Sequence, residues 1–367
     1  MLSLLLKEIR HNPLLWLLVF VPAVFAAEVL APDAPTLLFV LSILAIVPLA
    51  ALLSHATESV AAKTGDAVGG LLNATLGNLT ELVIALAALR AGEYVLVKAS
   101  IAGAIVANTL FMLGASFLLG GLKHRVQEYS RVGARFQASL LFLATIALLI
   151  PTSLADKERA SAEVMQTLSL GLAVLLIVAY GLGLVFSLKT HRDMFGSAEH
   201  AEAGEAPWPL GLALATLAGV TVLVALVSEV FVESVQEAAE TFGMSPAFVG
   251  FIVVALVGGA AEMASAFSGA RKNRLDLSVG IALGSAAQIA LFVAPVLVLL
   301  SYVIGPAPMS LEFWPGAVVM ILIATITASS VTNSGRSAWF VGVLLMMVYA
   351  IFAMTLYLLP PQTPPGP

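Results

Sequence analysis

Long, continuous runs of apolar residues dominate the chain. Eleven such segments can be delimited, at roughly 13–30, 36–62, 67–90, 94–120, 134–151, 163–188, 208–231, 244–270, 276–304, 312–331 and 337–360. Each is about twenty residues long, enough for a helix to cross roughly 30 Å of hydrocarbon. Strands of a membrane barrel would instead alternate apolar and polar residues over about ten residues. We therefore predict an all-α polytopic membrane protein with about eleven transmembrane helices.

The polar stretches between these segments divide the chain into two halves. Most are short turns, whereas residues 189–207 form the longest polar stretch and are rich in acidic residues. We expect residues 1–35 to form a transmembrane helix that is retained rather than cleaved, because its apolar run is long. Residues 36–188 and 208–367 then hold five helices each, joined by an acidic cytoplasmic linker at 189–207. That linker is either a solvated connection or a regulatory element.

Lysine and arginine are distributed unevenly between the two sides of the predicted bundle. With the N-terminus inside, 13 of the 17 basic residues fall on the inner side: Lys7, Arg10, Lys63, Lys123, Arg125, Arg131, Arg135, Lys189, Arg192, Arg271, Lys272, Arg274 and Arg336. The outer loops hold only Arg90, Lys98, Lys157 and Arg159. Because cytoplasmic loops are enriched in basic residues, we predict a cytoplasmic N-terminus and a C-terminus outside.

The composition supports a membrane protein and excludes several functions. Hydrophobic residues make up 60% of the 367 residues and charged residues 11%, against about 25% charged in a soluble domain. The lack of cysteine excludes a disulfide scaffold, a thiolate metal site and thiol catalysis. A net charge of −5 without a basic patch argues against nucleic-acid binding. The expected partner is the lipid bilayer of a prokaryotic plasma membrane, and a homo-oligomer is left open.

Three sequence landmarks recur in the same order in the two halves. They are Glu58-Ser59-Val60 and Glu233-Ser234-Val235; Gly77-Asn78-Leu79-Thr80-Glu81 and Gly258-Gly259-Ala260-Ala261-Glu262; and the segments 103–111 and 284–292, each of which begins with glycine and ends with phenylalanine. The third and eighth apolar segments cross the predicted membrane in opposite directions. The halves are therefore predicted to be inverted repeats of five helices, a feature of secondary transporters.

Two acidic residues lie deep inside apolar segments. Glu81 is about fourteen residues into the third segment and Glu262 about eighteen into the eighth. A carboxylate near the bilayer centre is energetically costly, so it normally faces a cavity, a partner or an ion. A protonated glutamate in one structural hydrogen bond is the alternative for an isolated residue. Two glutamates related by inverted symmetry favour a transport site near the membrane midplane.

Hard oxygen donors accompany the two glutamates in the sequence: Asn78, Thr80, Asn108, Ser285 and Gln288. Ca²⁺ takes about six to eight such oxygens in flexible geometry. The only histidine in an apolar segment is His55, and a lone histidine there is more often packed than a ligand. The donors favour Ca²⁺, with Mn²⁺ or Na⁺ as lesser options, over metals that prefer nitrogen or sulfur.

Glycine precedes each glutamate by about one helical turn, at Gly77 and at Gly258-Gly259. Because glycine weakens a helix, we predict breaks at these positions that free backbone carbonyls to bind a cation. Close packing between helices is another use of small residues in membranes, and it is compatible with a break.

The paired glutamates also account for coupling to protons. Two carboxylates close together hold either a divalent cation or protons, because like charges at short distance disfavour double ionisation. Such mutually exclusive occupancy is sufficient for antiport. Glu58 and Glu233, placed near opposite membrane sides, are predicted to relay protons or gate access to the site. The alternative is that both are ordinary polar helix ends.

The motifs resemble those of the calcium/proton exchanger (CAX) family, within the cation/Ca²⁺ exchanger superfamily. The resemblance rests on residues 77–82, 258–262 and 282–292 and extends over nearly the whole chain. It implies that Glu81 and Glu262 bind Ca²⁺ and protons alternately, and that residues 193–206 form an acidic helix. Further implied site residues are Asn78, Gly77, Gly258, Asn108, Ser285 and Gln288.

The chain departs from the family's pattern beside Glu262. The second repeat of the family usually reads Gly-Asn-Ala-Ala-Glu-His, whereas this chain has Gly259 in place of the asparagine and Met263 in place of the histidine. One amide and one imidazole are therefore lost from the second half of the site. Ion preference and pH dependence are left open by this difference.

The predicted function is exchange of Ca²⁺ for H⁺ by alternating access, with no cofactor and no enzymatic activity. A Na⁺/Ca²⁺ or other cation antiporter of the same superfamily would share the fold, and a cation channel would need a continuous pore. An intramembrane hydrolase is disfavoured because the sequence has no Gly-x-Gly-Asp motif. It also has no P-loop, so an ion gradient rather than ATP is the expected energy source.

Overall fold

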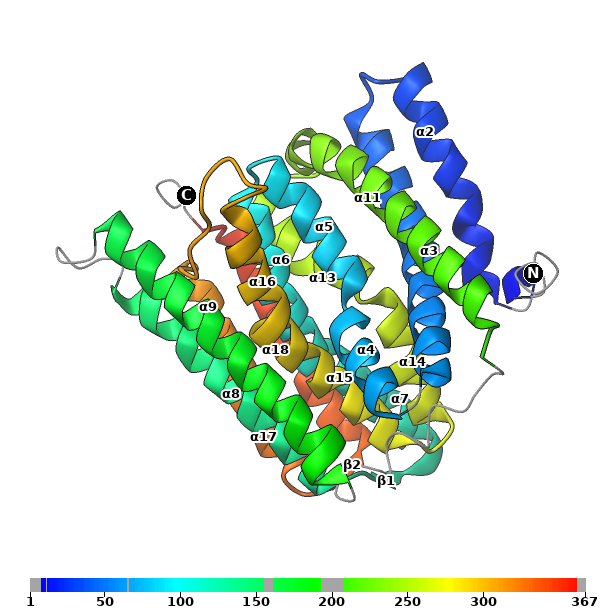
Figure 1. The fold of residues 1–367 in the computed structure, drawn as a ribbon, viewed down its shortest axis with the longest axis vertical. Coiled ribbons are helices and arrows are strands. Elements are labelled where there is room, and N and C mark those ends of the chain that lie inside the picture. Colours follow the sequence, from blue (N-terminus) through cyan, green and yellow to red (C-terminus); the bar gives the residue numbers. More distant parts are fainter. Residues whose placement is uncertain (1–7, 11, 65, 155–160, 193–206, 362–367) are drawn as a thin grey trace.

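The computed structural model describes residues 8–10, 12–64, 66–154, 161–192 and 207–361. These residues are almost entirely helical (Figure 1). Most of the linker expected at 189–207, including the acidic helix expected at 193–206, lies outside the described residues.

The helices of the first half follow the predicted apolar segments. In chain order the elements are η1 (Pro13–Val19), α2 (Phe20–Leu30), α3 (Pro35–Lys63), α4 (Asp66–Leu76), α5 (Leu79–Arg90), α6 (Tyr94–Val106), η2 (Ala107–Met112), α7 (Leu113–His124), β1 (Val126–Glu128), α8 (Arg131–Leu154), α9 (Ala162–Val185) and η3 (Phe186–Thr190). Here η1 is a 3₁₀ helix, whereas η2 and η3 are π-helical turns that continue the preceding helix.

The second half of the chain is likewise helical and holds two π-helical turns, as the first half does. Its elements are α11 (Leu210–Thr241), α12 (Pro246–Phe248), η5 (Val249–Val254), α13 (Ala255–Gly258), α14 (Ala260–Arg271), α15 (Leu275–Gln288), η6 (Ile289–Val293), α16 (Ala294–Ser301), α17 (Pro315–Thr332), β2 (Arg336–Ala338) and α18 (Trp339–Leu358). Proline begins α3, α12 and α17, where its fixed φ suits the first turn and its missing N–H leaves no bond unmade.

Two of the membrane-length helices are bent at the predicted glycines. The axis turns by 41° between α4 and α5, where Gly77 and Asn78 interrupt the helix. It turns by 58° between the α12–α13 stretch and α14, where Gly259 interrupts it. The breaks expected from the glycine positions are therefore present in both halves, and each leaves its glutamate in the first turn of the helix that follows.

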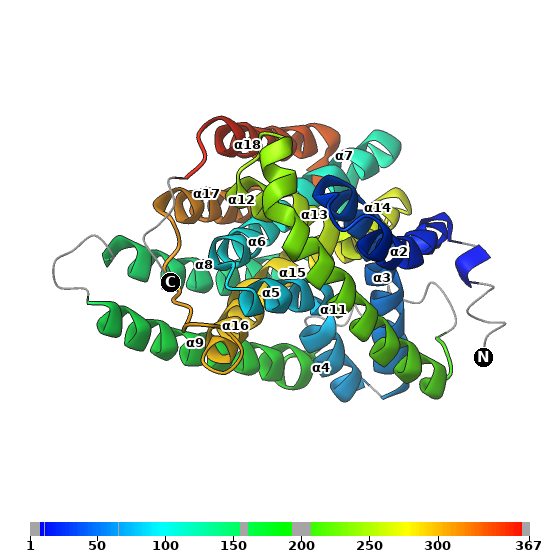
Figure 2. The ribbon, with the colours of Figure 1, turned by 90° about the horizontal axis from the view of Figure 1, so that it is seen from above.

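The helices form two flanks around a central group (Figures 1 and 2). On one side α3 and α11 pack along each other, with η1 and α2 against α3. On the other side α8 packs against α9 and α17. The broken helices, α6, α7, α15 and α16 lie between these flanks. Elements from the two chain halves are thus in contact throughout the centre of the molecule.

A short two-stranded sheet joins the halves at one end of the molecule. Strands β1 and β2 are antiparallel, with Gln127 opposite Ser337. The buried Gln127 amide nitrogen donates to the Ala270 carbonyl at 2.9 Å, and an exposed ion pair joins Arg336 to Glu128 at 2.6 Å. The buried hydrogen bond of Gln127 contributes more to stability than the ion pair, because exposed ion pairs add little to the free energy of folding.

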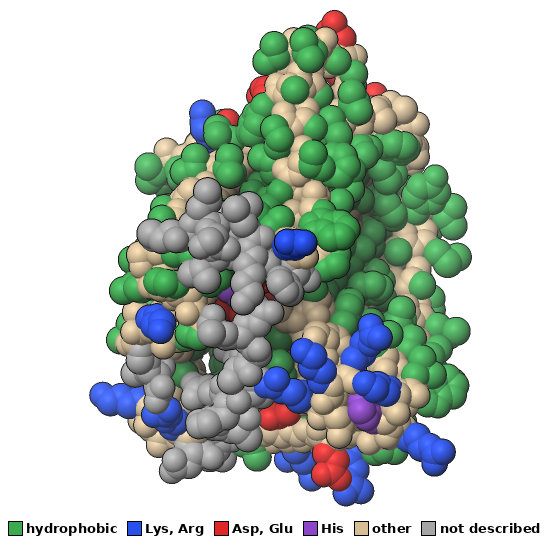
Figure 3. All heavy atoms as spheres, turned by 90° about the vertical axis from the view of Figure 1, so that its right-hand side faces the viewer, with side chains coloured by type: hydrophobic (Ala, Val, Ile, Leu, Met, Phe, Trp, Pro, Cys, Tyr) green, Lys and Arg blue, Asp and Glu red, His purple; other side chains and the backbone are tan. Residues whose placement is uncertain are grey.

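The molecule has the surface of an integral membrane protein. Among the described residues, nine helices are long and apolar enough to cross a membrane, or eleven if each bent pair counts as one span. The predicted number corresponds to the second way of counting. Figure 3 shows a broad apolar face, with lysine and arginine side chains gathered at the end of the molecule that carries β1 and β2.

Two details differ from the positions expected from the sequence. Lys98, counted with the outer loops, lies within α6, which begins at Tyr94 as the predicted segment 94–120 does; the turn before it contains Gly92 with a φ of 80°. Its ammonium reaches the Ser310 hydroxyl at 3.3 Å, as long cationic side chains do when their stems are buried. Glu233 lies within a helix rather than at its end, since α11 continues to Thr241.

Candidate functional site

Each helix break positions one glutamate in the same way. Glu81 is the third residue of α5 and Glu262 is the third residue of α14. The first turn of a helix presents unpaired N–H groups and the positive end of the helix dipole, which favour an ionised carboxylate. The local sequence therefore provides electrostatic support for both carboxylates in the centre of an apolar protein.

The Glu81 side chain lies against the break of the other half of the chain. A methyl group built at Gly258 would lie 3.0 Å from Cγ and 3.5 Å from the carboxyl carbon of Glu81. One built at Gly259 would lie 3.7 Å from Oε1 of Glu81. Glycine at these two positions therefore provides the room in which the Glu81 carboxylate approaches the second break.

The Glu262 carboxylate is tied in turn to the break of the first half. The Ser285 hydroxyl on α15 lies 2.6 Å from Oε2 of Glu262 and 2.7 Å from Oδ1 of Asn78. A hydroxyl carries one proton and donates to only one of these oxygens. The second contact therefore needs a proton from Glu262, or an Asn78 amide turned so that its nitrogen donates to Ser285.

Gln288, at the end of α15, completes this arrangement at the first break. A methyl group built at Gly77 would lie 3.3 Å from the Gln288 side-chain oxygen. Gly77 thus allows the amide of Gln288 to approach the interrupted backbone between α4 and α5. The four predicted residues Gly77, Asn78, Ser285 and Gln288 are brought together around this break.

Within the described residues, three amide side chains have buried nitrogens without a hydrogen-bond partner. They belong to Asn78, Asn108 and Gln288, whose side chains are almost completely buried. An unpaired buried polar atom is uncommon and calls for water or a ligand to complete its bonding. Asn78 and Gln288 lie at the first break, so their unpaired amides mark a polar centre that solvent or a hydrated cation would complete, whereas Asn108 lies on η2.

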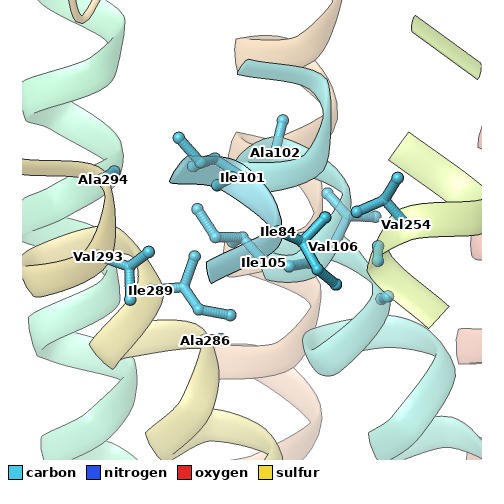
Figure 4. Packing of buried hydrophobic residues seen from close by; sticks show 14 of the residues in the cluster. Ile84, Ile101, Ala102, Ile105, Val106, Val254, Ala286, Ile289, Val293 and Ala294 are labelled. Carbon is cyan, nitrogen blue, oxygen red and sulfur yellow. The ribbon is translucent and has the colours of Figure 1, made fainter. Parts of the chain in front are cut away.

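The elements that carry the site residues also contribute to the buried hydrophobic core. Figure 4 shows Ile84 of α5, Ile105 and Val106 of α6, Val254 of η5 and Ile289 of η6 in one buried cluster. These four elements come from both halves of the chain. A low-dielectric surrounding strengthens electrostatic interactions inside it, so charge at Glu81 and Glu262 must be balanced by a cation or by protons.

Glu58, Glu233 and His55 lie away from the two breaks. Glu58 is exposed on α3 and accepts a hydrogen bond from Ser54 at 3.1 Å, and Glu233 is exposed on α11. Their proposed roles in proton relay or gating stay predictions. The His55 ring packs against Trp208, with ring centroids 4.3 Å apart, as expected for a packed histidine.

A tyrosine that the sequence analysis did not single out also contacts the first break. Tyr180 on α9 is buried, and its hydroxyl donates to the Ala74 carbonyl in the last turn of α4. Its ring stacks on Phe292 of η6, with centroids 5.6 Å apart. A polar ring in the middle of the sixth apolar segment was the only signal in the sequence that could have indicated it.

The donor set is one of oxygen atoms. Among the described residues, no group of three or more histidine, cysteine or acidic side chains gathers in a way that could hold a metal ion. The centre instead offers two carboxylates together with amide, hydroxyl and backbone oxygens. Such a set suits Ca²⁺, which accepts many neutral oxygens, better than metals that prefer nitrogen or sulfur.

The chain matches a known protein family over most of its length. The family model described as sodium/calcium exchanger protein matches residues 34–189 and 212–358, which include both broken helices. The chain belongs to the sodium/calcium exchanger family. The match covers most of the chain, and it confirms the resemblance drawn from the glutamate motifs.

Relatives in this family are similar over nearly their whole length. The chain is 42% identical over 361 residues to a Ca²⁺/H⁺ antiporter of Synechocystis, covering 94% of this chain and 96% of that one. It is 39% identical over 325 residues to the Ca²⁺/H⁺ antiporter ChaA of Bacillus subtilis, covering 88% and 92%.

Solved structures show the same exchanger fold. The structure of native YfkE matches with a TM-score of 0.79 and 35% identity, covering 94% of this chain and all of that one. The H⁺/Ca²⁺ exchanger CAX matches with a TM-score of 0.72 over 95% of this chain and 92% of that one. At 16% identity the second match concerns the fold alone.

Proposed function

We propose that the protein is a secondary active antiporter that exchanges Ca²⁺ for H⁺ at the site formed by Glu81 and Glu262. The observation that supports this proposal is that each glutamate approaches the helix break of the other half of the chain, directly or through one side chain. Glu81 lies against the break that precedes Glu262, and Glu262 is linked through Ser285 to the break that precedes Glu81. Relatives named Ca²⁺/H⁺ antiporters match this chain over most of its length.

The exchange follows from the charge of the two carboxylates. Both ionised carboxylates together with one Ca²⁺ make a neutral site, and two protonated carboxyls also make a neutral site. Because a net charge in a low-dielectric interior is unfavourable, Ca²⁺ and protons replace each other rather than leaving the site empty. Asn78, Asn108, Ser285 and Gln288 supply neutral oxygens, and the breaks at Gly77 and Gly258 supply carbonyls.

Alternating access is supported by the arrangement of the helices. Several contacts between the halves have a counterpart in which the two halves exchange roles. The contact of α11 with α5 corresponds to that of α3 with α14, and the contact of α7 with α18 corresponds to that of α16 with α9. The contact of α6 with α17 corresponds in the same way to that of α15 with α8. Within one flank, the hydroxyls of Thr145 of α8 and Thr325 of α17 meet at 3.0 Å. Such pairing is what two inverted repeats of five helices, residues 36–188 and 208–367, would produce.

The same layout gives the orientation in the membrane. Basic residues end α7 and α14 and begin α8, and Arg336 begins β2, so one end of the molecule is strongly basic. We place this end and the N-terminus in the cytoplasm of a prokaryotic cell, with the C-terminus outside.

The main competing function is exchange of another cation by the same fold. It is favoured by one observation: the second break offers Gly259 and Met263 instead of further ligands. Na⁺/Ca²⁺ exchange would drive Ca²⁺ flux with a Na⁺ gradient and no proton movement. Transport of Mn²⁺ or Na⁺ would appear as competition with Ca²⁺ uptake. A channel would pass current far above transporter rates.

The deciding experiment is ⁴⁵Ca²⁺ uptake into proteoliposomes under an imposed pH gradient. We expect uptake that follows the gradient, collapses with a protonophore, and is abolished in Glu81→Gln and in Glu262→Gln. Glu240→Gln, an exposed residue near the end of α11, serves as the matched control and should transport normally. Wild-type protein that moves Ca²⁺ only with a Na⁺ gradient, or not at all, would overturn the proposal.

A further inference from the structure

Two buried tyrosines occupy corresponding places in the two halves of the protein. Tyr180 lies on α9 and stacks on Phe292 of η6, with ring centroids 5.6 Å apart. Tyr349 lies on α18 and packs against Phe111 of η2, with centroids 5.3 Å apart. Phe111 and Phe292 end the recurring segments 103–111 and 284–292, so each tyrosine contacts the corresponding phenylalanine of the opposite half.

The hydrogen bonding of the two tyrosines is nevertheless different. The Tyr180 hydroxyl donates to the carbonyl of Ala74, four residues before Asn78. The Tyr349 hydroxyl is buried and has no hydrogen-bond partner in the described part of the chain. A buried hydroxyl without a partner is unfavourable because it has lost its bonds to water, so this difference needs a reason.

The backbone at the two breaks supplies that reason. The residue that corresponds to Ala74 is Ala255, four residues before Gly259. Its carbonyl accepts the backbone N–H of Gly259 at 3.2 Å. Within the described residues no such bond runs from Asn78 to Ala74, and the Ala74 carbonyl is bonded by Tyr180 instead. Each carbonyl therefore has either the break's own N–H or the tyrosine as its partner.

From this asymmetry we infer that Tyr180 and Tyr349 form a reciprocal hydrogen-bond switch that positions the two broken helices in alternation. In the conformation seen here, Tyr180 bonds the Ala74 carbonyl at the first break and Tyr349 is released. In the opposite access state, Tyr349 takes the Ala255 carbonyl and the Gly259 bond is lost. At the same time Tyr180 releases Ala74, and the Asn78 N–H returns to it.

The switch suits a transporter because it leaves the number of bonds unchanged. In each state the alanine carbonyl at one break is bonded by a tyrosine, and the alanine carbonyl at the other break is bonded by a backbone N–H. The two states therefore differ little in hydrogen-bond energy. Inverted repeats produce the two access states by exchanging their conformations. This inference rests on the alternating access proposed above, and it assigns positioning roles, without contact to the cation, to two residues outside the ion site.

A tyrosine-to-phenylalanine change removes one side of the switch while preserving ring packing. Tyr180→Phe should favour the opposite access state, and Tyr349→Phe the present one. The readout is the ratio of the apparent KM for Ca²⁺ measured from the two faces, in right-side-out and inside-out membrane vesicles. A binding-competent state that is less populated weakens apparent affinity from its own face.

The expected result is a shift of that ratio in opposite directions by the two variants. Each shift should be about three- to tenfold, the size of one net hydrogen bond. The double variant should return towards the wild-type ratio. Tyr302→Phe, an exposed tyrosine after α16, is the control and should leave the ratio unchanged. If wild-type protein exchanges Ca²⁺ normally but the two variants shift the KM ratio in the same direction, or not at all, the switch is wrong and the proposed function still stands.

A second readout does not depend on transport. The chain has no cysteine, so single cysteines report accessibility directly. Thr75→Cys and Leu256→Cys place one thiol directly after each of the two alanines. We expect Tyr180→Phe and Tyr349→Phe to change the ratio of the two labelling rates in opposite directions. Unchanged labelling would overturn the switch even if wild-type protein moved no Ca²⁺, an outcome that would separately overturn the proposed function.

Discussion

The two helix breaks place equivalent glutamates with different surroundings. The first break bends by 41° and carries Asn78 and Thr80 before Glu81. The second bends by 58° and carries only Gly259 and two alanines before Glu262. The methyl of Met263 would lie 3.4 Å from a methyl built at Gly259, so this side chain occupies space beside the missing amide.

This difference shows how one geometry can be assembled from unequal parts. The first half supplies polar groups near its break, and Asn78 reaches across to Ser285. The second half supplies room, because Gly258 and Gly259 admit the Glu81 side chain. The two halves therefore contribute equivalent carboxylates but different neutral ligands. We expect the neutral ligands to determine which ion the site prefers.

Removing the room at the second break should have the largest effect. In Gly258→Val the new side chain would begin 3.0 Å from Cγ of Glu81 and push the carboxylate out of place. A displacement of about 1 Å in a positioned group lowers activity on the order of 100-fold, so we expect a comparable fall in ⁴⁵Ca²⁺ uptake. Gly280→Val, where a methyl meets nothing within 4 Å, is the control. Equal uptake by both variants would show that Glu81 does not need this space.

Removing the polar group at the first break should have a smaller effect. Asn78→Ala deletes an amide that contacts Ser285 and leaves that hydroxyl with Glu262 alone. The loss of one buried hydrogen bond near a charged group corresponds to an increase of about tenfold in the apparent KM for Ca²⁺. Asn333→Ala, an exposed amide at the end of α17, should behave as wild type. An unchanged KM in Asn78→Ala would remove this residue from the site.

Making the second break more like the first should sharpen the comparison further. Gly259→Asn combined with Met263→Ala restores an amide and vacates the space that the methionine methyl fills. We expect the double variant to bind Ca²⁺ about threefold more tightly, the effect of one added polar ligand. Gly259→Asn alone should bind more weakly than the double variant, because Met263 stays in the way. Competition of Mn²⁺ and Na⁺ with ⁴⁵Ca²⁺ measures the accompanying change in preference, and identical single and double variants would contradict the steric argument.

An exposed charge pair between the halves should matter least. Arg90 and Glu229 meet at 2.8 Å, but their side chains are 71% and 44% exposed. Exposed ion pairs contribute about 0–1 kcal/mol, so Arg90→Gln should change thermal stability in detergent only slightly and leave uptake unchanged. A large loss of exchange would show that this contact, and not the breaks alone, controls the movement of α11 against α5.

Much of this protein was determined by local features of the sequence. The length of the apolar runs predicted the membrane helices, because hydrocarbon thickness fixes the length of a span. Gly77 and Gly258-Gly259 predicted the breaks, since glycine weakens a helix wherever it stands. Glu81 and Glu262 were predicted as the site because a carboxylate inside the membrane is energetically costly and normally faces a cavity, a partner or an ion. Boundaries were less certain, and α11 extends ten residues beyond the predicted end at 231.

Only the tertiary structure decided which groups meet across the two halves. Ser285 contacts Asn78 over 207 positions in the chain, and no local pattern encodes that contact. The same holds for the approach of Glu81 to Gly258 and for the bond from Tyr180 to Ala74, which depend on how α9, α4 and the broken helices pack. Sequence patterns report which residues share a helix face, whereas the pairing of faces depends on packing summed over the whole bundle.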